Sequence, residues 1–355
     1  MSKNISNNSY LLGLLFIIAL AVPAYHLSAS KRICMEKKSE IQIVTSATDP
    51  EISIDGEAEL AAFCSGHGTG SYGDPFIIEN YIINASSTHG IAINNTDSYV
   101  TIRNCTIENG TNYHGIYISH SSNVNITNNS VAKNTYGIYT FECDNSSIAL
   151  NNASGNYGAM FVDYCENMTL IDNSAEESQM FGILLKDSLN GTAYDNKINE
   201  TNYGLYLLNS NNYTINHNEL SNNGFGIGLD AANWTTCKDN ILTTNGFWLR
   251  NSYNNSIDTS NKVNDQSMRY YEDESGVVLS GELDVGQVIL NNCSSCIIEN
   301  IEVENSSVGL QVLDSNHNLI SGINSTHHSD TGITLYNSKN NTISSSTVNE
   351  NENRG

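Results

Sequence analysis

Proline and positive charge are scarce in this 355-residue chain. Its three Pro are Pro23, Pro50 and Pro75, so no Pro interrupts a strand ladder after residue 75. Lys and Arg total 15 against 38 Asp and Glu, a formal net charge of −23 at pH 7. Such a chain lacks the basic footprint of a nucleic-acid-binding protein and is not attracted to an anionic membrane surface. Only 15% of its residues are charged, which argues against helices braced by ion pairs.

Asn and Tyr are abundant instead. Asn supplies 53 residues, several times its ordinary share, and Tyr supplies 19. A hydrophobic content of 39% is too high for a simply disordered chain. This composition predicts a β-rich, turn-rich, acidic and exported protein.

The N-terminal segment predicts export from the cytosol. Residues 11–24 form an apolar run behind a short head that carries Lys3, which is the length of a signal-peptide core and short for a membrane span. We predict a signal peptide over residues 1–24, or alternatively an uncleaved membrane anchor, followed by a linker over residues 25–50. Eighteen Asn-x-Ser/Thr sequons between Asn84 and Asn340 predict a cell-surface or extracellular glycoprotein, although a chain this rich in Asn also forms sequons by chance.

A repeat of about 22 residues occupies the chain from residue 76 onward. A Gly precedes a short alternating apolar run in most repeats, and an aromatic residue often precedes that Gly. Runs this short are strands, and a unit this small cannot bury an apolar face alone, so the units are expected to stack as a coil. Asn recurs at the same period, where we expect a structural ladder of side-chain hydrogen bonds. The ladder positions are Asn129, Asn151, Asn173, Asn196, Asn218 and Asn240.

These observations predict an all-β fold, a single-stranded right-handed parallel β-helix of about twelve rungs over residues 76–355. Residues 51–75 are predicted to form an N-terminal cap, with a short helix at 57–63, and the lead-in to the first rung. The repeat breaks between Trp248 and Gly286, which predicts an insertion at about residues 262–282. No second cap follows Val348, so the C-terminal end is expected to continue into, or be covered by, another segment; alternatively the chain is a fragment.

The repeat resembles the NosD-like and carbohydrate-binding/sugar-hydrolase (CASH) parallel β-helix repeat proteins, which share the pectin lyase-like fold. The resemblance rests on the Gly-Ile-x-Ile…Asn pattern, on the opening run from Ile54 through Gly68 to Asn80, and on the rung from Gly286 to Asn300. It spans about residues 51–355 and is similar to exported archaeal members. It implies a β-helix. For function it implies a surface protein, a sugar-active enzyme, or a periplasmic protein linked to copper delivery to nitrous oxide reductase.

Paired carboxylates are the first candidate chemistry. Asp144 and Glu166 are 22 residues apart, so stacking places them on neighbouring rungs about 5 Å apart, near the separation that retaining glycosidases use. They are the candidate catalytic residues of a polysaccharide lyase or glycoside hydrolase. An acidic β-helix also stacks carboxylates without catalysis. The paired-Asp and Arg-Ile-Lys motifs of pectin-degrading relatives are missing, as is the basic–acidic cluster of a calcium-dependent pectate lyase, so we favour a protein without catalysis.

Metal binding is the second candidate chemistry. Cys293 and Cys296 have CxxC spacing, and exported copper sites use Cys, His and Met. His89 and His114 precede consecutive repeat glycines and could stack. The opposing interpretation makes Cys293 a core thiol on a ladder of small residues, because no second CxxC occurs. We predict no cofactor, with copper or calcium as the alternatives.

Cys143 and Cys165 are expected on neighbouring rungs, within disulfide range. In an exported protein they form a disulfide, or they remain thiols that replace Ser in an internal ladder. The sequence leaves both alternatives open.

The predicted insertion and its approach supply the candidate ligand-binding residues, which are Trp248, Tyr270, Tyr271, Glu272 and Asp273. Aromatic rings beside carboxylates can hold a sugar by stacking and hydrogen bonding. The alternative is a hairpin flap that packs on the rod.

The sequence therefore predicts a non-catalytic cell-surface or secreted module that binds glycans or surface proteins. A polysaccharide lyase or hydrolase is the first alternative and a NosD-like copper-delivery protein is the second. Two close carboxylates in an open groove beside aromatic rings would favour the enzyme. Side chains of His, Cys or Met that converge outside the core would favour copper. The expected partner is a polysaccharide or a surface glycoprotein.

Overall fold

The computed structural model describes residues 48–352. The predicted signal peptide or anchor, and nearly all of the predicted linker, lie outside the described residues. Strand β1 (Ile52–Asp55) and helix α2 (Glu57–Phe63) open the described part, and the helix occupies the positions predicted for the cap. Leu60 of this helix is buried in the core of the coil. Among residues 48–352, no helix is long and apolar enough to cross a membrane.

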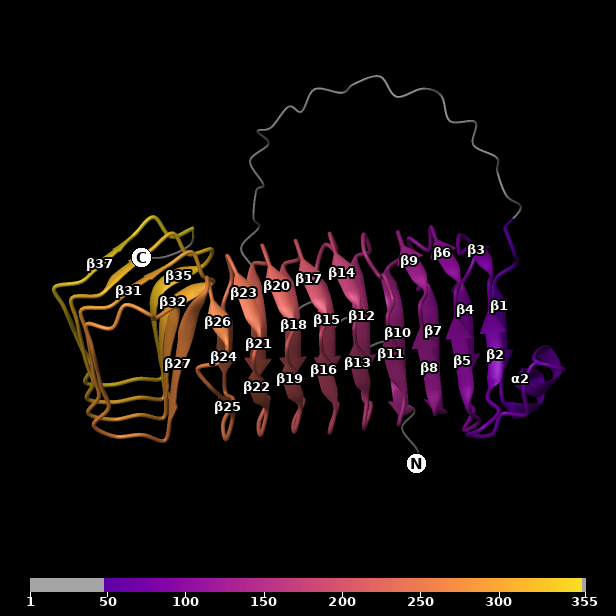
Figure 1. Cartoon of the computed structure of the whole chain (residues 1–355), viewed down its shortest axis with the longest axis horizontal. Helices are drawn as coiled ribbons and strands as arrows, with labels where there is room; N and C mark the ends of the chain where they lie inside the picture. Colours follow the sequence, from indigo (N-terminus) through magenta and orange to yellow (C-terminus); the bar gives the residue numbers. More distant parts are fainter. Residues whose placement is uncertain (1–47, 353–355) are drawn as a thin grey trace, which may run out of the picture. The chain divides into compact units, whose positions relative to one another are not determined.

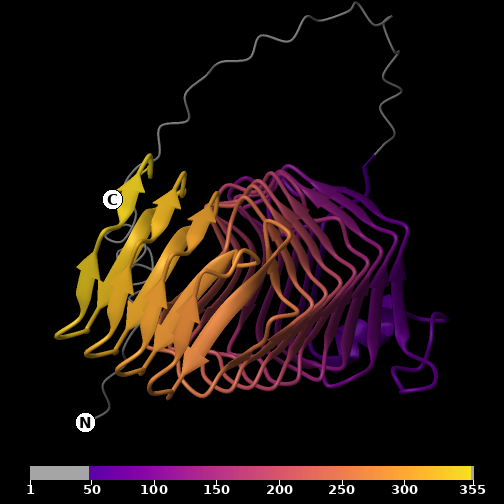
Figure 2. The ribbon, with the colours of Figure 1, turned by 60° about the vertical axis from the view of Figure 1, so that its left-hand side comes forward.

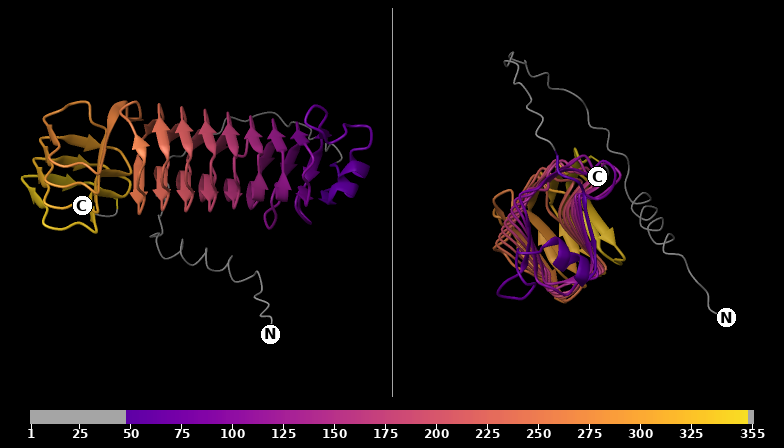
Figure 3. Two further views of the ribbon diagram at one scale, coloured as in Figure 1. Left: turned by 90° about the horizontal axis from the view of Figure 1, so that it is seen from below. Right: turned by 90° about the vertical axis from the view of Figure 1, so that its right-hand side faces the viewer.

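The chain after α2 forms a parallel β-helix, as the repeat predicts (Figures 1 and 3). Most turns contribute one strand to each face, and strands of successive turns pair in parallel. The first sheet has nine strands: β1, β4 (Ile91–Asn94), β7 (Ile116–Ser122), β10 (Tyr136–Asp144), β12 (Gly158–Asp163), β15 (Phe181–Lys186), β18 (Tyr203–Leu208), β21 (Phe225–Asp230) and β24 (Phe247–Arg250). The second sheet also has nine: β2 (Phe76–Glu79), β5 (Val100–Arg103), β8 (Val124–Thr127), β11 (Ser147–Ala149), β13 (Thr169–Ile171), β16 (Thr192–Tyr194), β19 (Thr214–Asn216), β22 (Thr236–Lys238) and β25 (Ser256–Ile257).

The third face of the coil is divided among several sheets. It begins with β3 (Ile82–Asn84), β6 (Thr106–Glu108) and β9 (Ser130–Ala132). A nine-stranded sheet follows: β14 (Ser174–Glu176), β17 (Lys197–Asn199), β20 (Glu219–Ser221), β23 (Ile241–Thr243), β26 (Lys262–Val263), β27 (Gln266–Glu272), β29 (Gln287–Asn291), β32 (Val308–Leu313) and β35 (Thr331–Tyr336). Two smaller sheets complete the later turns: β28 (Val278–Ser280), β30 (Ile297–Glu299), β33 (Leu319–Ser321) and β36 (Thr342–Ser344); and β31 (Glu302–Glu304), β34 (Asn324–Thr326) and β37 (Thr347–Asn349).

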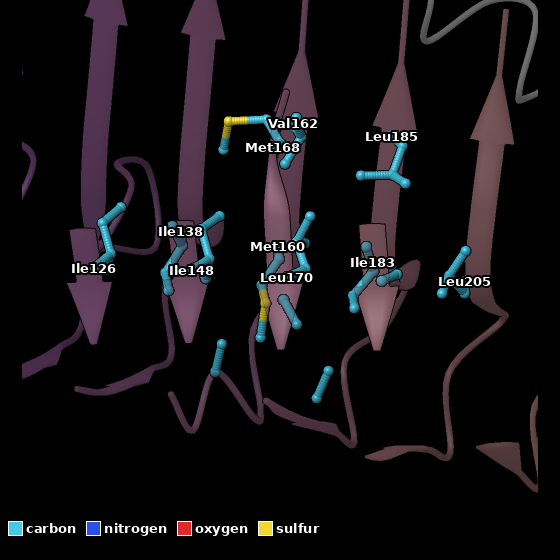
Figure 4. Packing of buried hydrophobic residues seen from close by; sticks show 14 of the residues in the cluster. Ile126, Ile138, Ile148, Met160, Val162, Met168, Leu170, Ile183, Leu185 and Leu205 are labelled. Carbon is cyan, nitrogen blue, oxygen red and sulfur yellow. The ribbon is translucent and has the colours of Figure 1, made fainter. Parts of the chain in front are cut away.

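Aliphatic ladders fill the inside of the coil (Figure 4). Ile138, Met160 and Ile183 are partners in register on neighbouring strands of the first sheet. Ile148 and Leu170 are partners on the second sheet. All five side chains are buried. Because each turn repeats the same inward positions, every apolar side chain packs against its counterparts on the turns before and after it.

The six predicted Asn residues form a hydrogen-bonded ladder inside the coil. The amide nitrogen of Asn196 donates to Asn218 Oδ1 at 2.9 Å and to the Leu170 carbonyl at 2.9 Å. Its own Oδ1 accepts from the backbone and side-chain nitrogens of Asn173, at 3.1 and 3.0 Å. The ladder continues one turn further, to Asn261. It satisfies buried backbone groups at a corner where the strands end.

Cys143 and Cys165 belong to a similar ladder of small residues. Both are buried thiols, and the Cys143 amide donates to the Cys165 sulfur at 3.2 Å. Ser188 follows in the same position, where its hydroxyl accepts from the Cys165 amide at 3.0 Å. Of the two alternatives that the sequence left open, the structure contains the thiol ladder and not the disulfide.

The chain reverses direction at residues 264–265. β26 and β27 pair antiparallel, and the two residues between them, Asn264 and Asp265, both have positive φ. This is the geometry of a two-residue β-hairpin. β27 then pairs in parallel with β29, which begins a second stack of turns. Residues 262–282, interpreted above as an insertion, are therefore the last strand of the first coil, the hairpin, and the first turn of a second coil.

The second coil, β27 to β37, covers the end of the first (Figure 2). The strands β27, β29 and β32 have a core on each face. Met268, Tyr270, Ile289 and Leu313 pack with the core of the first coil. Alternate residues on the same strands line a separate core: Val288, Leu290, Leu310 and Val312. One sheet thus serves as a wall of the second coil and as a lid on the first.

Two glutamine side chains pair with the edge of β24. Gln287 Oε1 accepts from the Phe247 amide at 2.8 Å, and its nitrogen donates to the Phe247 carbonyl at 2.8 Å. Gln311 donates to the same carbonyl at 2.7 Å and accepts from the Leu249 amide at 3.1 Å. An unpaired edge strand is a template for aggregation, and here buried side-chain amides occupy the place of a tenth strand.

The last described turn is open to solvent. Ile343 is 45% exposed, whereas its register partner Ile320 on the turn before is fully buried. Leu335 is 40% exposed, whereas its partner Val312 is also buried. Within residues 48–352 nothing covers these side chains. That another segment continues or covers this end stays a prediction.

Candidate functional site

Aromatic side chains cover the outward face of the first sheet. We call this set the aromatic face; its members lie at outward positions of successive turns and form a cluster separate from the inner core. They are His114, Tyr117, Tyr136, Tyr139, Phe161, Phe181, Tyr203, Tyr206, Phe225 and Trp248. Parallel pairing in register aligns equivalent positions, so the rings stack along the coil. Tyr139 and Phe161 have centroids 4.8 Å apart, and Tyr203 and Phe225 are 5.3 Å apart.

The middle of the aromatic face is closed by its own packing. Phe161 is 3% exposed and Phe181 is 4% exposed although both lie outside the coil. The ring faces there are used within the stack, which leaves ring edges and phenol groups at the surface. Accessible ring faces are therefore expected at the end of the stack, where Trp248 on β24 is the last member.

Two ion pairs lie along one line beside the aromatic face. Asp163 and Lys186 are register partners, and Asp163 Oδ1 is 2.9 Å from Lys186 Nζ. Lys186 also lies 2.9 Å from Asp187 and its ammonium sits over the Tyr164 ring. Burial raises the pKa of Asp163, although the hydrogen bond from Lys186 acts in the opposite direction. Two turns further, Asp230 and Arg250 are register partners and form the second pair.

Asp230 connects the second ion pair to the aromatic rings. Arg250 Nε donates to Asp230 Oδ1 at 2.9 Å, and Arg250 Nη2 donates to the other oxygen. The Tyr206 hydroxyl donates to Asp230 Oδ2 at 2.9 Å. The Arg250 guanidinium lies 5.2 Å from the centre of the Trp248 ring. The bidentate contact raises the pKa of Arg250 and fixes the guanidinium beside the indole.

Gly228 makes room for this arrangement. It lies between Tyr206 and Trp248 in register, on β21. A Cβ at this position would stand 2.6 Å from a ring carbon of Tyr206. The glycine thus lets the Tyr206 ring lie over β21, toward Asp230 and Trp248.

The second coil completes the cluster. The hydroxyl of Tyr253, which follows β24, donates to Asp314 Oδ2 at 2.9 Å, across 61 residues of sequence. The Asp314 amide donates to the carbonyl of Tyr336 on β35 at 3.0 Å. Burial and then the hydrogen bond to Asp314 raise the pKa of Tyr253 to about 12. Tyr336 contributes to the raised pKa of both Arg250 and Tyr253, so it lies close enough to connect the two groups of contacts. We call the whole set the junction cluster: Tyr206, Asp230, Trp248, Arg250, Tyr253, Asp314 and Tyr336.

The other ligand-binding residues predicted from sequence have internal contacts. Tyr270 packs against the first core and Tyr271 against the second. Glu272 accepts the backbone amides of residues 254 and 255, both at 2.8 Å, and so holds the last turn of the first coil. Asp273 accepts a hydrogen bond from the side chain of Asn292, its neighbour on the next turn. Of the five predicted residues, only Trp248 belongs to the junction cluster.

The predicted catalytic pair lies on neighbouring turns, at exposed positions. Asp144 Oδ1 accepts the backbone amide of Glu166 at 2.8 Å. Asp144 therefore has a structural partner at the turn. The aromatic face and the junction cluster are built from other residues.

The predicted metal ligands do not fit a copper or calcium ion. Cys293 and Cys296 are buried, and burial raises the pKa of the Cys293 thiol to about 11. His89 and His114 stack with centroids 4.8 Å apart, and His89 Nδ1 accepts the His114 amide. Burial lowers the pKa of His114 to about 3. Over residues 48–352, no three side chains of His, Cys, Asp or Glu are grouped to hold a metal ion.

Sequence reasoning missed six members of the junction cluster: Tyr206, Asp230, Arg250, Tyr253, Asp314 and Tyr336. Asp230 and Arg250 have a usable signal, because opposite charges one repeat apart become register partners. Asp314 and Tyr336 are brought in by the reversal, which the repeat period does not show.

Comparisons with known proteins identify the family. No curated protein matches the chain. Among solved structures, PfbA, a surface adhesin of Streptococcus pneumoniae, is 12% identical over 76% of this chain and 69% of its own, with a TM-score of 0.41. A GH136 lacto-N-biosidase from Eubacterium ramulus is 12% identical over 74% of this chain and 51% of its own, with a TM-score of 0.43. The A-module of the Azotobacter vinelandii mannuronan C-5 epimerase AlgE4 is 11% identical over 84% and 95%, with a TM-score of 0.38.

These likenesses concern the β-helix, and no activity follows from them. The family described as periplasmic copper-binding protein (NosD) matches residues 68–275, which is more than half of the chain. The matched span runs from the loop after α2 to the first turn of the second coil. It confirms the resemblance that the repeat motifs carry, and this chain belongs to the NosD family.

Proposed function

We propose that this protein is a non-catalytic β-helix module, exported to the cell surface or secreted, that binds a glycan at the junction cluster and along the aromatic face. The observation that carries the proposal is the junction cluster. It gathers four aromatic side chains, two carboxylates and a guanidinium at the place where two coils meet.

The chemistry of the cluster suits a sugar. A pyranose has C–H faces that pack on aromatic rings and hydroxyls that bond to carboxylates and guanidinium groups. Trp248 supplies a ring at the end of the stack. Tyr336 on β35 supplies a second ring and is 45% exposed. Asp314 and Arg250 supply acceptors and donors. Arg250 and Tyr206 are fixed by Asp230, so little side-chain freedom is lost on binding.

The two Trp residues allow a direct test. Trp234→Phe leaves Trp248 as the single Trp of the chain. A polysaccharide that binds is expected to shift the fluorescence emission of this variant. The same polysaccharide is expected to shift the emission of Trp248→Phe much less. Trp248→Ala should weaken affinity about tenfold or more, the loss typical of a central aromatic contact. Tyr72→Ala is the matched control, because Tyr72 is an exposed aromatic residue near the N-terminal cap.

The polysaccharide lyase or hydrolase remains the first alternative. The same binding screen should be read for release of reducing ends or of unsaturated products. Binding without product supports the proposal, and product that disappears in Asp144→Asn or Glu166→Gln would replace it with the enzyme.

Copper delivery is the second alternative, since the family is described as copper-binding. The described donors do not form a site for the ion. Metal analysis of the purified full-length protein tests this alternative, and stoichiometric copper in the absence of glycan binding would contradict the proposal. Export through residues 1–24, and glycosylation at exposed sequons such as Asn145 and Asn212, belong to the same proposal.

A further inference from the structure

Resting on the proposed function, we infer that the ligand of the junction cluster is a neutral glycan and that the site rejects polymers of uronic acids. The surface supplies rings and hydrogen-bonding groups for an uncharged sugar. Its two cations are each already paired with a carboxylate of the protein, so no net positive charge is left for a carboxylate ligand.

Both cations on the strands of the first sheet are already bound to carboxylates. These are Lys186 and Arg250. Lys186 bonds to Asp163, whose side chain is 9% exposed, and Arg250 bonds to Asp230, whose side chain is 4% exposed. A uronate that captured either cation would leave a buried carboxylate without its partner. Breaking a buried ion pair in this way is strongly unfavourable.

The remaining charges beside the site are negative. Asp314 lies at the surface of the junction, where its carboxylate accepts hydrogen bonds from Tyr253 and Asn337. Asp187 lies beside Lys186. Counting Asp163, Asp187, Asp230 and Asp314 against Lys186 and Arg250, four carboxylates face two cations. The whole chain carries a formal charge of −23, which repels a polyanion at longer range.

A bridging divalent cation does not remove this repulsion. Calcium can bridge a protein carboxylate to a uronate, but it needs six to eight oxygen ligands, several of them from one protein site. Of the two carboxylates in the junction cluster, Asp230 is occupied by Arg250 and Tyr206, and Asp314 by Tyr253 and Asn337. Over residues 48–352, no group of three acidic or His and Cys side chains is arranged around a common point.

The test compares neutral polymers with uronates of similar linkage. The full-length protein is titrated with β-1,4-mannan oligosaccharides and with β-1,4-polymannuronate oligosaccharides of the same length, in EDTA. We expect the best neutral ligand to bind at least about fivefold more tightly than its uronate counterpart, the Coulomb penalty of like charges about 4 Å apart in water. The affinity for the neutral ligand should change less than about twofold between ~0.05 M and ~0.5 M NaCl, because no ion pair forms.

A charge-neutral variant identifies the cause of the selectivity. Asp314→Asn keeps an oxygen that can accept from Tyr253 and removes one negative charge. We expect it to raise the affinity for the uronate relative to the affinity for its neutral counterpart, and so to narrow the gap between the two ligands. Tighter binding of a uronate than of any neutral ligand, or binding that high salt abolishes, would overturn the inference while the proposed glycan binding stood. Absence of binding to both ligand sets would overturn the proposed function, and this inference with it.

Discussion

His328 is expected to make the second coil sensitive to acid. It is fully buried at a ladder position of the second coil. Its Nδ1 accepts the Ser306 amide at 3.2 Å, and its Nε2 is 3.0 Å from the Ser325 hydroxyl. Protonation of Nδ1 would place a donor against the donor of Ser306. Burial is the main cause that lowers the pKa of His328 from 6.5 to about 4.

The sign of the effect follows from proton binding. Between pH 6.5 and about 4 the unfolded chain binds a proton at this residue and the folded chain does not. The free energy of unfolding is therefore highest above pH 6.5 and falls as the pH falls toward 4. At pH 5 the loss is about 2 kcal/mol, since each unit of pKa difference is worth about 1.4 kcal/mol.

The measurement is urea unfolding at pH 7 and pH 5, followed by far-UV circular dichroism. His328→Asn is the informative variant, because Asn134 and Asn156 stand at the equivalent position on earlier turns and accept a backbone amide there. This variant should lose about 2 kcal/mol less than wild type between the two pH values. His327→Asn is the control, since His327 is exposed beside Glu350. An equal pH dependence in wild type and His328→Asn would refute the reasoning.

Three further variants test the ladder, the junction and the site. Asn196→Ala should lower the free energy of unfolding by about 4 kcal/mol in urea titrations, because it leaves three buried polar groups without partners. Gln287→Ala with Gln311→Ala should cost roughly 3 kcal/mol and increase aggregation in light scattering, because both uncover the edge of β24. Gly228→Ala should push the Tyr206 ring from its place and weaken glycan affinity severalfold, with an unchanged circular dichroism spectrum. Normal affinity in Gly228→Ala would show that this ring position does not matter for binding.

The period of the sequence predicts most of the first coil. A spacing of about 22 residues specifies which residues become register partners, so the Asn ladder and the placement of Cys143 beside Cys165 follow from it. The cap helix follows from its local amphipathic pattern. These features depend on the local residue pattern and on contacts between equivalent positions of neighbouring turns. Both can be read from a single sequence.

The reversal could not be read from the period. The number of extra residues between two repeats does not show whether they form a loop on one stack of turns or a hairpin that starts a second stack. The local signal was Asn264-Asp265 between two short apolar runs, since Asn and Asp tolerate the positive φ of a two-residue hairpin. Without the reversal, Tyr270 and Glu272 are assigned to ligand binding, and Asp314 cannot be placed beside Tyr253.

The reversal of the chain at residues 264–265 both closes the end of the first coil and forms the candidate site. A stack of parallel strands needs both ends closed, and α2 closes the first end with Leu60. The second end is closed by β27, β29 and β32, and this placement also sets Asp314 beside Tyr253. Loosening the lid should therefore weaken glycan affinity even though Gln287 and Gln311 lie outside the junction cluster. Asn196→Ala should lower stability without this loss, because its ladder lies within the first coil. Equal effects of the two kinds of variant on affinity would show that the site does not depend on the lid.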